Sequence, residues 1–438
     1  MKSYRMLRVC SAGMYTRLFA DFYEANRLDQ VSYDDALQAY RENGYLTPGG
    51  WSECMRELGN ESTEVVPDFS LLQKKWVQER GIKVDFTGQD WSVPTLMAQI
   101  DEYRPDVILF CWGAFHTVPS GVRRQLKTHY PFLKIVTGLW TDIPPRGDYS
   151  IFDALDMVFA ADRYFADELS SVGLETHLMY SCFDNVFCQL DGFDENGRNT
   201  QDLVFAGSSG YGYENHQQRY FDLVELMQNT NLLVWSWERK LKWPPSFWRR
   251  TKNIVVRLLS KMNPAVALEI KNRLARSGRQ SRLSRLIDEA MENRAVQEPI
   301  WKAPWWSHRR PLSEIFPDRC FPPVFGLEYY RLLKRAKVVF NTHIDDARHY
   351  GNFRMFEATG VGSCLLTDRG EESAELFVPD QEIVTYSSID ECIEKVAYLL
   401  DHETVRREIA LRGQRRTLRD HTVMQRCRQI DEILQKAI

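Results

Sequence analysis

Short apolar runs alternate with amphipathic segments along most of the chain. Three runs are apolar at nearly every position, and they read MLRVC, DVILFCW and LKIVTGLWTD. Such runs are typical of strands that are buried on both faces of a parallel sheet. Between them lie segments such as MYTRLFADFYEAN and RYFADELSSVG, whose apolar residues recur at helical spacing. This alternation predicts an α/β domain with a doubly wound parallel sheet over residues 1–195.

The same alternation starts again after a polar stretch, DENGRNTQ, at residues 194–201. Beyond it we expect strands at DLVFAG, NLLVWSW, KVVFNT, SCLLTD and EIVTY. Helices are expected at HQQRYFDLVELMQNT, EYYRLLKRA, FRMFEATG, IDECIEKVAYLLDH and TVRREIALRGQRRTLRDH. The pattern therefore predicts a second doubly wound domain over residues 196–420 and a closing amphipathic helix over residues 421–438.

Length and composition agree with this division. A chain of 438 residues is long enough for two domains. It contains no run of about 18 apolar residues, so no segment is predicted to span a membrane. The nine cysteines are scattered without a CxxC pair, which makes a zinc site unexpected and indicates reduced thiols in a cytosolic protein. The first apolar run indicates a strand rather than a signal peptide.

The charge of the chain is unevenly distributed. The formal net charge is −4, yet residues 238–310 hold 18 Lys and Arg against 6 Asp and Glu. Seven of the twelve tryptophans lie in the same neighbourhood, residues 235–306. Two interpretations remain open: a helical insertion packed on the second domain, or a segment that contacts an anionic membrane interface or an acceptor. Nucleic-acid binding is not expected, because the chain as a whole is acidic and carries no such motif.

Two doubly wound domains bind ligands at the carboxyl ends of their strands, in the crevice between the domains. Small and polar residues follow the predicted strands at residues 11–13, 113–116, 141–142, 207–210, 341–343 and 367–369. Loops favour small and polar residues in general, so these positions mark where a site would lie without identifying its chemistry.

One stretch, HYGNFRMFEATGVGSCLLTDRG at residues 349–370, joins a short helix to a strand. Asn352 can cap this helix, and Arg354 and Glu357 lie three residues apart on one of its faces. A helix N-terminus with an arginine beside it attracts a diphosphate, and a carboxylate one turn later can accept hydrogen bonds from a ribose. The same spacing also fits a plain Arg–Glu pair on a helix surface, so spacing alone leaves both interpretations open.

From about residue 341 to its end, the chain resembles the nucleotide-sugar-binding half of a GT-B glycosyltransferase. It is most similar to the "glycosyl transferases group 1" branch, which includes spore-maturation-like proteins and bacterial polysaccharide enzymes. The resemblance is carried by VVFNTHID, NFRMFEATGVGSCLLTD, ELFVPDQEIVTYSSIDECIEKVAYLLDH and REIALRGQRRTLRDHT, in this order over roughly a hundred residues. Upstream, LVFAGSSGYGYENHQQR resembles the first strand and loop of that half. The first 195 residues match in pattern only.

The resemblance implies a GT-B architecture, with two Rossmann-like domains facing across a cleft, a basic insertion at 238–310 and a last helix that packs back on the first domain. It implies a nucleotide-diphosphate sugar as the donor substrate, with no other cofactor and no metal ion, because cationic side chains and helix dipoles stabilise the leaving diphosphate. It assigns the ribose to Glu357 and the phosphates to Arg354. The remaining donor-site residues that it implies are Asn341, His343, Gly207, Ser208 and Arg219, with Asn352 at the helix start.

The chain departs from one common pattern of that family. Many retaining members carry a second glutamate eight residues before the ribose glutamate, but His349 occupies that position here. The resemblance therefore does not predict the anomeric outcome. An inverting enzyme needs a general base on the acceptor side. We expect Asp142 in that role, with His116 as the second candidate, while a turn residue and a backbone-bonded loop histidine are the structural alternatives.

The function expected from this resemblance is transfer of a sugar to a glycan or lipid-linked acceptor in bacterial surface polysaccharide or glycoconjugate assembly. The protein would be cytoplasmic and peripheral on the inner face of the membrane. The alternative is a non-catalytic protein of surface-layer assembly that binds nucleotide sugars or glycans. A dehydrogenase is not expected, because CSAGMYTR after the first strand lacks the GxGxxG pattern.

Overall fold

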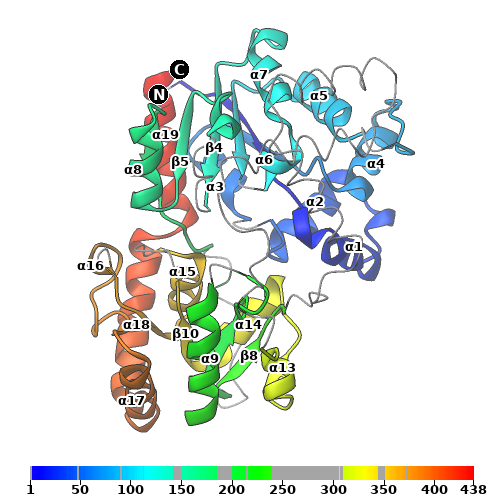
Figure 1. Cartoon of the computed structure of the whole chain (residues 1–438). Helices are drawn as coiled ribbons and strands as arrows, with labels where there is room; N and C mark the ends of the chain where they lie inside the picture. Colours follow the sequence, from blue (N-terminus) through cyan, green and yellow to red (C-terminus); the bar gives the residue numbers. More distant parts are fainter. Residues whose placement is uncertain are drawn as a thin grey trace, which may run out of the picture.

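The structure is a computed structural model in which two α/β lobes are stacked and each lobe contains a parallel sheet (Figure 1). It describes residues 2–46, 49–88, 91–111, 113–141, 149–184, 187, 200–213, 216–238, 305, 309–343, 351–370 and 373–438. The predicted α/β class with two doubly wound parallel sheets is confirmed.

The first lobe is built on a six-stranded parallel sheet with the strand order β2-β1-β3-β4-β5-β6. The strands are β1 Arg5–Val9, β2 Glu61–Val65, β3 Val107–Cys111, β4 Ile135–Trp140, β5 Met157–Ala160 and β6 Thr176–Leu178. The helices are α1 Thr16–Ala25, α2 Tyr33–Glu42, α3 Trp51–Glu57, α4 Ser70–Glu79, α5 Ser92–Tyr103, α6 Ala114–Thr117, α7 Ser120–His129 and α8 Arg163–Ser171. The central strands are apolar because helices cover both faces of the sheet, which buries residues such as Leu7 and Phe110 completely.

The second lobe repeats this plan with the strand order β12-β11-β10-β7-β8-β9. The strands are β7 Gln201–Ala206, β8 Leu233–Trp235, β9 Cys320–Phe321, β10 Ala336–Asn341, β11 Cys364–Asp368 and β12 Val384–Tyr386. The helices are α9 Gln217–Asn229, α13 Leu312–Ile315, α14 Gly326–Arg335, α15 Phe353–Gly360, α16 Ser373–Leu376, α17 Ile389–Asp401, α18 Glu403–Asp420 and α19 Val423–Ala437. Strand order reverses between β7 and β10, and a sheet of this type places its ligand site at such a switch point.

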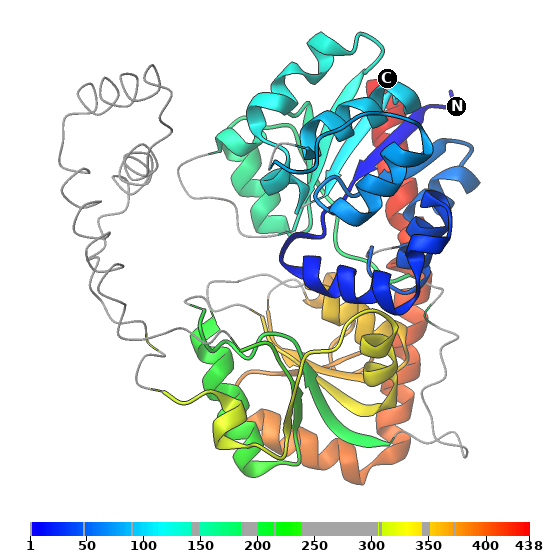
Figure 2. The same cartoon turned by 90° about the vertical axis from the view of Figure 1, so that its right-hand side faces the viewer.

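The carboxyl ends of the two sheets face each other. Figure 2 shows α1, which follows β1, on the side of the first lobe that faces the second lobe. The lobes touch there, since the rings of Tyr15 and Phe325 lie 5.2 Å apart. The amide of Leu327 also donates to the carbonyl oxygen of Asn43 at 3.1 Å. Residues that follow the strands of either lobe therefore gather around one interlobe region.

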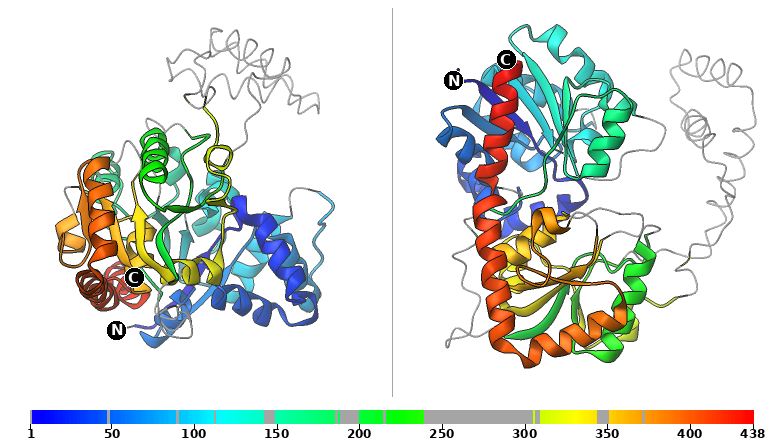
Figure 3. Two further views of the ribbon diagram at one scale, coloured as in Figure 1. Left: turned by 90° about the horizontal axis from the view of Figure 1, so that it is seen from below. Right: turned by 90° about the vertical axis from the view of Figure 1, so that its left-hand side faces the viewer.

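The last two helices connect the lobes along one side of the molecule (Figure 3). Helix α18 packs on α15 in the second lobe, whereas α19 packs on α3 in the first. Cys427, Ile430 and Leu434 of α19 join the same buried cluster as Trp51, and Asn60 donates to the Asp431 carboxylate at 2.8 Å. Within the described parts of the chain, we find no helix with both the length and the apolar character needed to cross a membrane.

Candidate nucleotide-diphosphate site

The N-terminus of α15 is capped as its sequence predicts. The side-chain oxygen of Asn352 accepts a hydrogen bond from the Met355 amide at 3.3 Å. The amide nitrogen of the same side chain donates to Oδ1 of Asn341 at 3.1 Å. Because Asn341 is the last residue of β10, these two bonds fix the start of α15 against the carboxyl end of a central strand.

Arg354 in the first turn of α15 points toward the end of β7. Its Nη1 donates to Oδ1 of Asn341 at 2.9 Å, and its guanidinium lies 4.8 Å from the centre of the Phe205 ring. A Cβ atom on Gly207 would come within 2.1 Å of Nη2 of Arg354. Only glycine therefore leaves room for this arginine at the loop after β7, and the predicted pair Arg354 and Gly207 is brought together.

Asn341 acts as a positioning residue at this junction. It is fully buried, its Oδ1 accepts from both Asn352 and Arg354, and its Nδ2 donates to Oγ1 of Thr367 at 3.0 Å. One amide thus holds the ends of β10 and β11 and the start of α15 in register. The sequence predicted that Asn341 lines the donor site, and in the structure its side chain connects the ends of β10 and β11 to the start of α15.

Arg219 and His216 belong to the start of α9, on the other side of Arg354. Arg219 donates to the carbonyl oxygens of Ser208 and Thr342 at 3.4 and 3.1 Å. Burial, together with the charges of Arg219 and Arg354, lowers the pKa of His216 to about 3. His216 is therefore neutral at pH 7, and the charges of the two guanidinium groups add to the effect of burial.

Glu357 lies one turn after Arg354 and is buried. The hydroxyl of Tyr329 donates to its Oε2 at 2.6 Å, and that of Tyr330 to its Oε1 at 3.3 Å. Burial raises the pKa of Glu357, while the two tyrosine hydroxyls and Arg354 oppose this rise. No ion pair joins Glu357 to Arg354 in the described residues, so the alternative of a surface Arg–Glu pair is wrong.

Glu357 also faces the first lobe. Burial raises the pKa of Tyr15, and the nearby groups Tyr213 and Glu357 raise it further. Tyr15 follows β1 in the first lobe, whereas Tyr213 belongs to the loop between β7 and α9. The carboxylate is thus close to the region where the two lobes meet.

His343 and Asp368 form a pair at the ends of β10 and β11. Nδ1 of His343 lies 2.8 Å from Oδ1 of Asp368, and the His343 amide donates to Oδ2 at 3.1 Å. Although burial raises the pKa of Asp368, His343 and the donor groups around it lower the value overall. An imidazole held by a carboxylate in this way has a fixed orientation.

Of the two predicted acceptor-side residues, the structure describes His116 but not Asp142. His116 is an exposed residue of α6, beyond the carboxyl end of β3, and its ring lies 6.3 Å from that of Trp140. Asp142 lies outside the described residues, as do most of residues 238–310. Both base assignments stay predictions.

Several partners of the predicted residues were not found by sequence reasoning. They are Phe205, His216, Tyr329, Tyr330 and Asp368. Asp368 alone had a signal, since it belongs to the polar residues that follow a predicted strand. The tyrosines lie in a predicted helix, but the periodicity does not indicate which helix they face.

Comparison with protein families gives a match in the second half of the chain. Residues 279–432 match a family model described as "Glycosyl transferase-like". No curated protein sequence matches the chain.

Solved structures match over the whole chain at low identity. The Anabaena protein HepE in complex with UDP-glucose is 12% identical with a TM-score of 0.53, covering 99% of this chain and 100% of that protein. Sucrose-phosphate synthase from Thermosynechococcus elongatus is 9% identical with a TM-score of 0.51, covering 99% and 98%. An alpha-glucosyltransferase in complex with UDP-glucose and DNA is 9% identical with a TM-score of 0.50, covering 99% of each chain. At these identities the likeness shows a shared fold.

Proposed function

We propose that the chain is a glycosyltransferase that transfers a sugar from a nucleoside-diphosphate donor bound between α15 and the β7–α9 loop. The observation that carries this proposal is the convergence of Arg354, Arg219 and the N-terminus of α15 at the strand ends. The complexes of HepE and of the alpha-glucosyltransferase with UDP-glucose support a donor of this kind.

The chemistry of transfer explains why cations belong at this position. The bond between the anomeric carbon and the diphosphate oxygen breaks, and the electron pair leaves with the diphosphate. Negative charge therefore grows on the phosphate oxygens in the transition state, where Arg354 and the α15 N-terminus would stabilise it. We propose that these groups suffice and that no divalent metal ion is required.

Glu357 would hold the ribose of the donor. A carboxylate offers about four lone pairs, so one that already accepts from Tyr329 and Tyr330 can still accept from ribose hydroxyls. The two tyrosines fix the carboxylate in one orientation before the donor arrives. This arrangement makes the ribose contact preorganised, which reduces the entropy lost on binding.

The acceptor oxygen must lose a proton as it bonds to the anomeric carbon, and Asp142 and His116 remain the candidates for the base. We propose a glycan or lipid-linked acceptor in surface polysaccharide assembly, with a peripheral membrane contact through the basic, Trp-rich residues 238–310. The composition of that segment is what supports the contact.

The test is a thermal-shift screen of the full chain with UDP, GDP, dTDP, CMP and their common sugars, first with EDTA and then with Mg²⁺. A ligand at 100 times its Kd adds about 2.7 kcal/mol, which raises Tm by about 3 °C for a 438-residue chain that unfolds as one unit. We expect such a rise in EDTA with one nucleoside diphosphate and its sugar. A rise that needs Mg²⁺ would contradict metal independence, and no rise with any nucleotide would contradict the donor site.

A second readout separates the enzyme from a non-catalytic binder. The donor selected by the screen is incubated with the protein, and release of its diphosphate is followed with and without glycan acceptors. The proposal expects release in the presence of an acceptor, because the diphosphate is the leaving group. Tight binding without any release would favour the non-catalytic alternative.

A further inference from the structure

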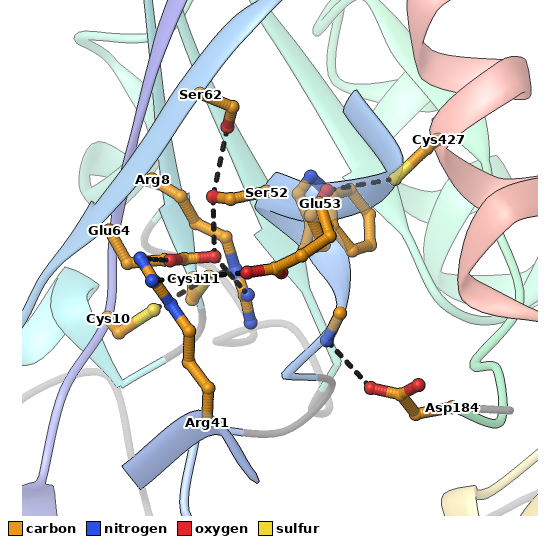
Figure 4. A network of polar contacts seen from close by, with 12 residues as sticks. Arg8, Cys10, Arg41, Ser52, Glu53, Ser62, Glu64, Cys111, Asp184 and Cys427 are labelled. Carbon is orange, nitrogen blue, oxygen red and sulfur yellow. Dashed lines mark hydrogen bonds and ion pairs between the residues drawn. The ribbon is translucent and has the colours of Figure 1, made fainter. Parts of the chain in front are cut away.

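The first lobe contains a buried polar network that the proposed function does not use (Figure 4). Arg8 of β1 and Glu64 of β2 are paired in register, with Nη1 of Arg8 at 3.3 Å from Oε1 of Glu64. Arg41 of α2 contacts the other carboxylate oxygen, and Oγ of Ser52 donates to Oε1 at 2.6 Å. The side chains of Arg8 and Glu64 are only 3% and 0% exposed.

Two cysteines lie beside this network, side by side at the carboxyl edge of the sheet. Cys10 directly follows β1, Cys111 is the last residue of β3, and their sulfur atoms are 4.0 Å apart. The two strands are parallel neighbours whose register pairs Val9 with Phe110, so Cys10 and Cys111 continue that register. Neighbouring strands are about 4.8 Å apart, which lies within the Cα separations that disulfides bridge.

The chain after each cysteine is held in place. The Ser11 hydroxyl and the amides of Ala12 and Gly13 donate to the Asp68 carboxylate at 2.5–2.9 Å. A Cβ atom on Gly113 would lie 2.8 Å from Cβ of Ser11, so the two segments touch immediately beyond the sulfur atoms. The paired strands before the two cysteines and the touching segments after them thus keep the two backbones adjacent. Only the two sulfur atoms must move closer for a disulfide to form.

The two thiols differ in reactivity. Nε of Arg8 donates to Sγ of Cys111 at 3.2 Å. The hydrogen bond from Cys10 and the charge of Arg8 lower the pKa of Cys111 against the effect of burial. The hydrogen bond to Cys111 and burial raise the pKa of Cys10. Cys111 is partly exposed whereas Cys10 is buried, so the more acidic thiol belongs to the less buried residue.

None of the other described cysteines accepts a hydrogen bond from a cationic side chain. Burial raises the pKa of Cys182, Cys364 and Cys427, and all three are buried. A thiol becomes a nucleophile when a cation stabilises its thiolate, so these three provide internal controls.

We propose that Cys10 and Cys111 form a redox-active pair, in which Cys111 reacts with a peroxide and Cys10 then closes a disulfide. The Cys111 thiolate attacks one peroxide oxygen, the O–O bond breaks, and the products are a sulfenic acid and, after protonation, water. The Cys10 sulfur then attacks the Cys111 sulfur, forms the S–S bond and releases a second water with its proton. The two sulfur atoms lose two electrons, which reduce the peroxide. An added dithiol reverses the reaction.

The test uses the full reduced chain and hydrogen peroxide, with peptide mapping by mass spectrometry under non-reducing conditions. We expect a cross-link between the peptides of Cys10 and Cys111 that dithiothreitol removes. The cross-link should form at least ten times faster than oxidation of Cys182, Cys364 or Cys427. Two free thiols at positions 10 and 111 after those controls have been oxidised would overturn the proposal.

Two variants assign the roles within the pair. Cys10→Ser should leave a sulfenic acid on Cys111 that dimedone traps, whereas Cys111→Ser should stop peroxide consumption by the pair. Cys54→Ser serves as the control because Cys54 lies on α3, outside the pair, and it should retain the cross-link. Equal peroxide reactivity in wild type and Cys111→Ser would contradict the assignment. The wild-type map remains decisive if either variant fails to fold.

Discussion

Both lobes place an arginine near the carboxyl ends of their sheets, but the two arginines have different neighbours. Arg8 in the first lobe pairs with the Glu64 carboxylate, which Arg41 also contacts. Arg354 in the second lobe donates to an amide oxygen and lies over the ring of Phe205, and no carboxylate among the described residues forms an ion pair with it. Removal of one partner from a buried ion pair destabilises the fold, whereas a cation held by neutral groups keeps its charge for a ligand.

The difference also affects the neighbouring titratable groups. In the second lobe burial lowers the pKa of His216, and the charges of Arg219 and Arg354 lower it further. In the first lobe Arg8 forms an ion pair with Glu64 and donates a hydrogen bond to Cys111, so its positive charge is balanced by groups of the same lobe. Substitutions in the first network should therefore change stability, and those in the second should change ligand affinity.

The largest expected effect is on the first network. Glu64→Ala leaves Arg8 and Arg41 buried without their carboxylate, which should lower the free energy of unfolding by about 3–5 kcal/mol. Urea denaturation of wild type and variant measures this difference. The matched control is Glu61→Ala on the same strand, because the exposed pair of Arg5 and Glu61 should contribute about 1 kcal/mol or less. Equal losses in the two variants would contradict the account.

Glu357→Gln should weaken binding of the nucleoside diphosphate selected by the screen about 10-fold, because hydrogen bonds to a charged group contribute about 1.5–3 kcal/mol. The variant should also lose the preference of the wild type for ribose over 2′-deoxyribose, which calorimetric titration of both nucleotides measures. Glu328→Gln on the exposed side of α14 is the control and should bind like wild type. An unchanged ribose preference in Glu357→Gln would exclude the ribose contact.

Gly207→Ala should have a smaller effect on affinity, and because the φ of Gly207 is +152°, the backbone strain of an alanine there should also lower Tm. The added Cβ meets Nη2 of Arg354 at 2.1 Å, and the flexible side chain must move away. We expect affinity for the diphosphate to fall by about 3- to 10-fold, since part of a charged hydrogen bond is lost. Gly81→Ala is the matched control, because its φ is also positive, at +65°, and a Cβ there meets no atom within 4 Å. If both variants bind equally well, Arg354 does not act from this position.

A further effect concerns the connection between the lobes. Nη2 of Arg426 donates to Nδ1 of His421 at 3.0 Å, and Nε2 of His421 lies 3.0 Å from the Leu376 carbonyl oxygen. Burial, then Arg426, lowers the pKa of His421 from 6.5 to about 4. As the pH is lowered, the unfolded chain therefore binds a proton at this histidine before the folded chain does. The contribution of neutral His421 to the free energy of unfolding is fully present above pH 6.5 and is lost as the pH drops from 6.5 to 4. Urea denaturation at several pH values should show a shallower fall in His421→Gln.

The same contrast explains how much the sequence could predict. Strands β1, β3 and β4 are apolar runs and were predicted, but β2 reads ESTEV and was not. Its buried Glu64 is compensated by Arg8 and Arg41, which lie 56 and 23 positions earlier in the chain, so no local pattern indicates that it is buried. A strand whose buried charges are ion-paired therefore cannot be recognised from the periodicity of apolar residues in the sequence.

The candidate site was predicted in part for a related reason. The Asn352 cap is a local interaction, and the sequence signal for it was sufficient. The tyrosines that hold Glu357 come from α14, and their orientation depends on how two helices pack. The wrong alternative, a surface pair of Arg354 and Glu357, followed from spacing alone, because spacing does not show that each side chain has a partner on another element.

The most direct measurement is a calorimetric titration in EDTA of the selected nucleoside diphosphate, and of its nucleoside without phosphates, into wild type, Arg354→Ala and Arg354→Lys. The account predicts that Arg354→Ala binds the diphosphate about 10- to 100-fold more weakly while nucleoside affinity is unchanged, and that Arg354→Lys lies between. Equal diphosphate affinity in wild type and Arg354→Ala would contradict the claim that this arginine keeps its charge for the donor phosphates.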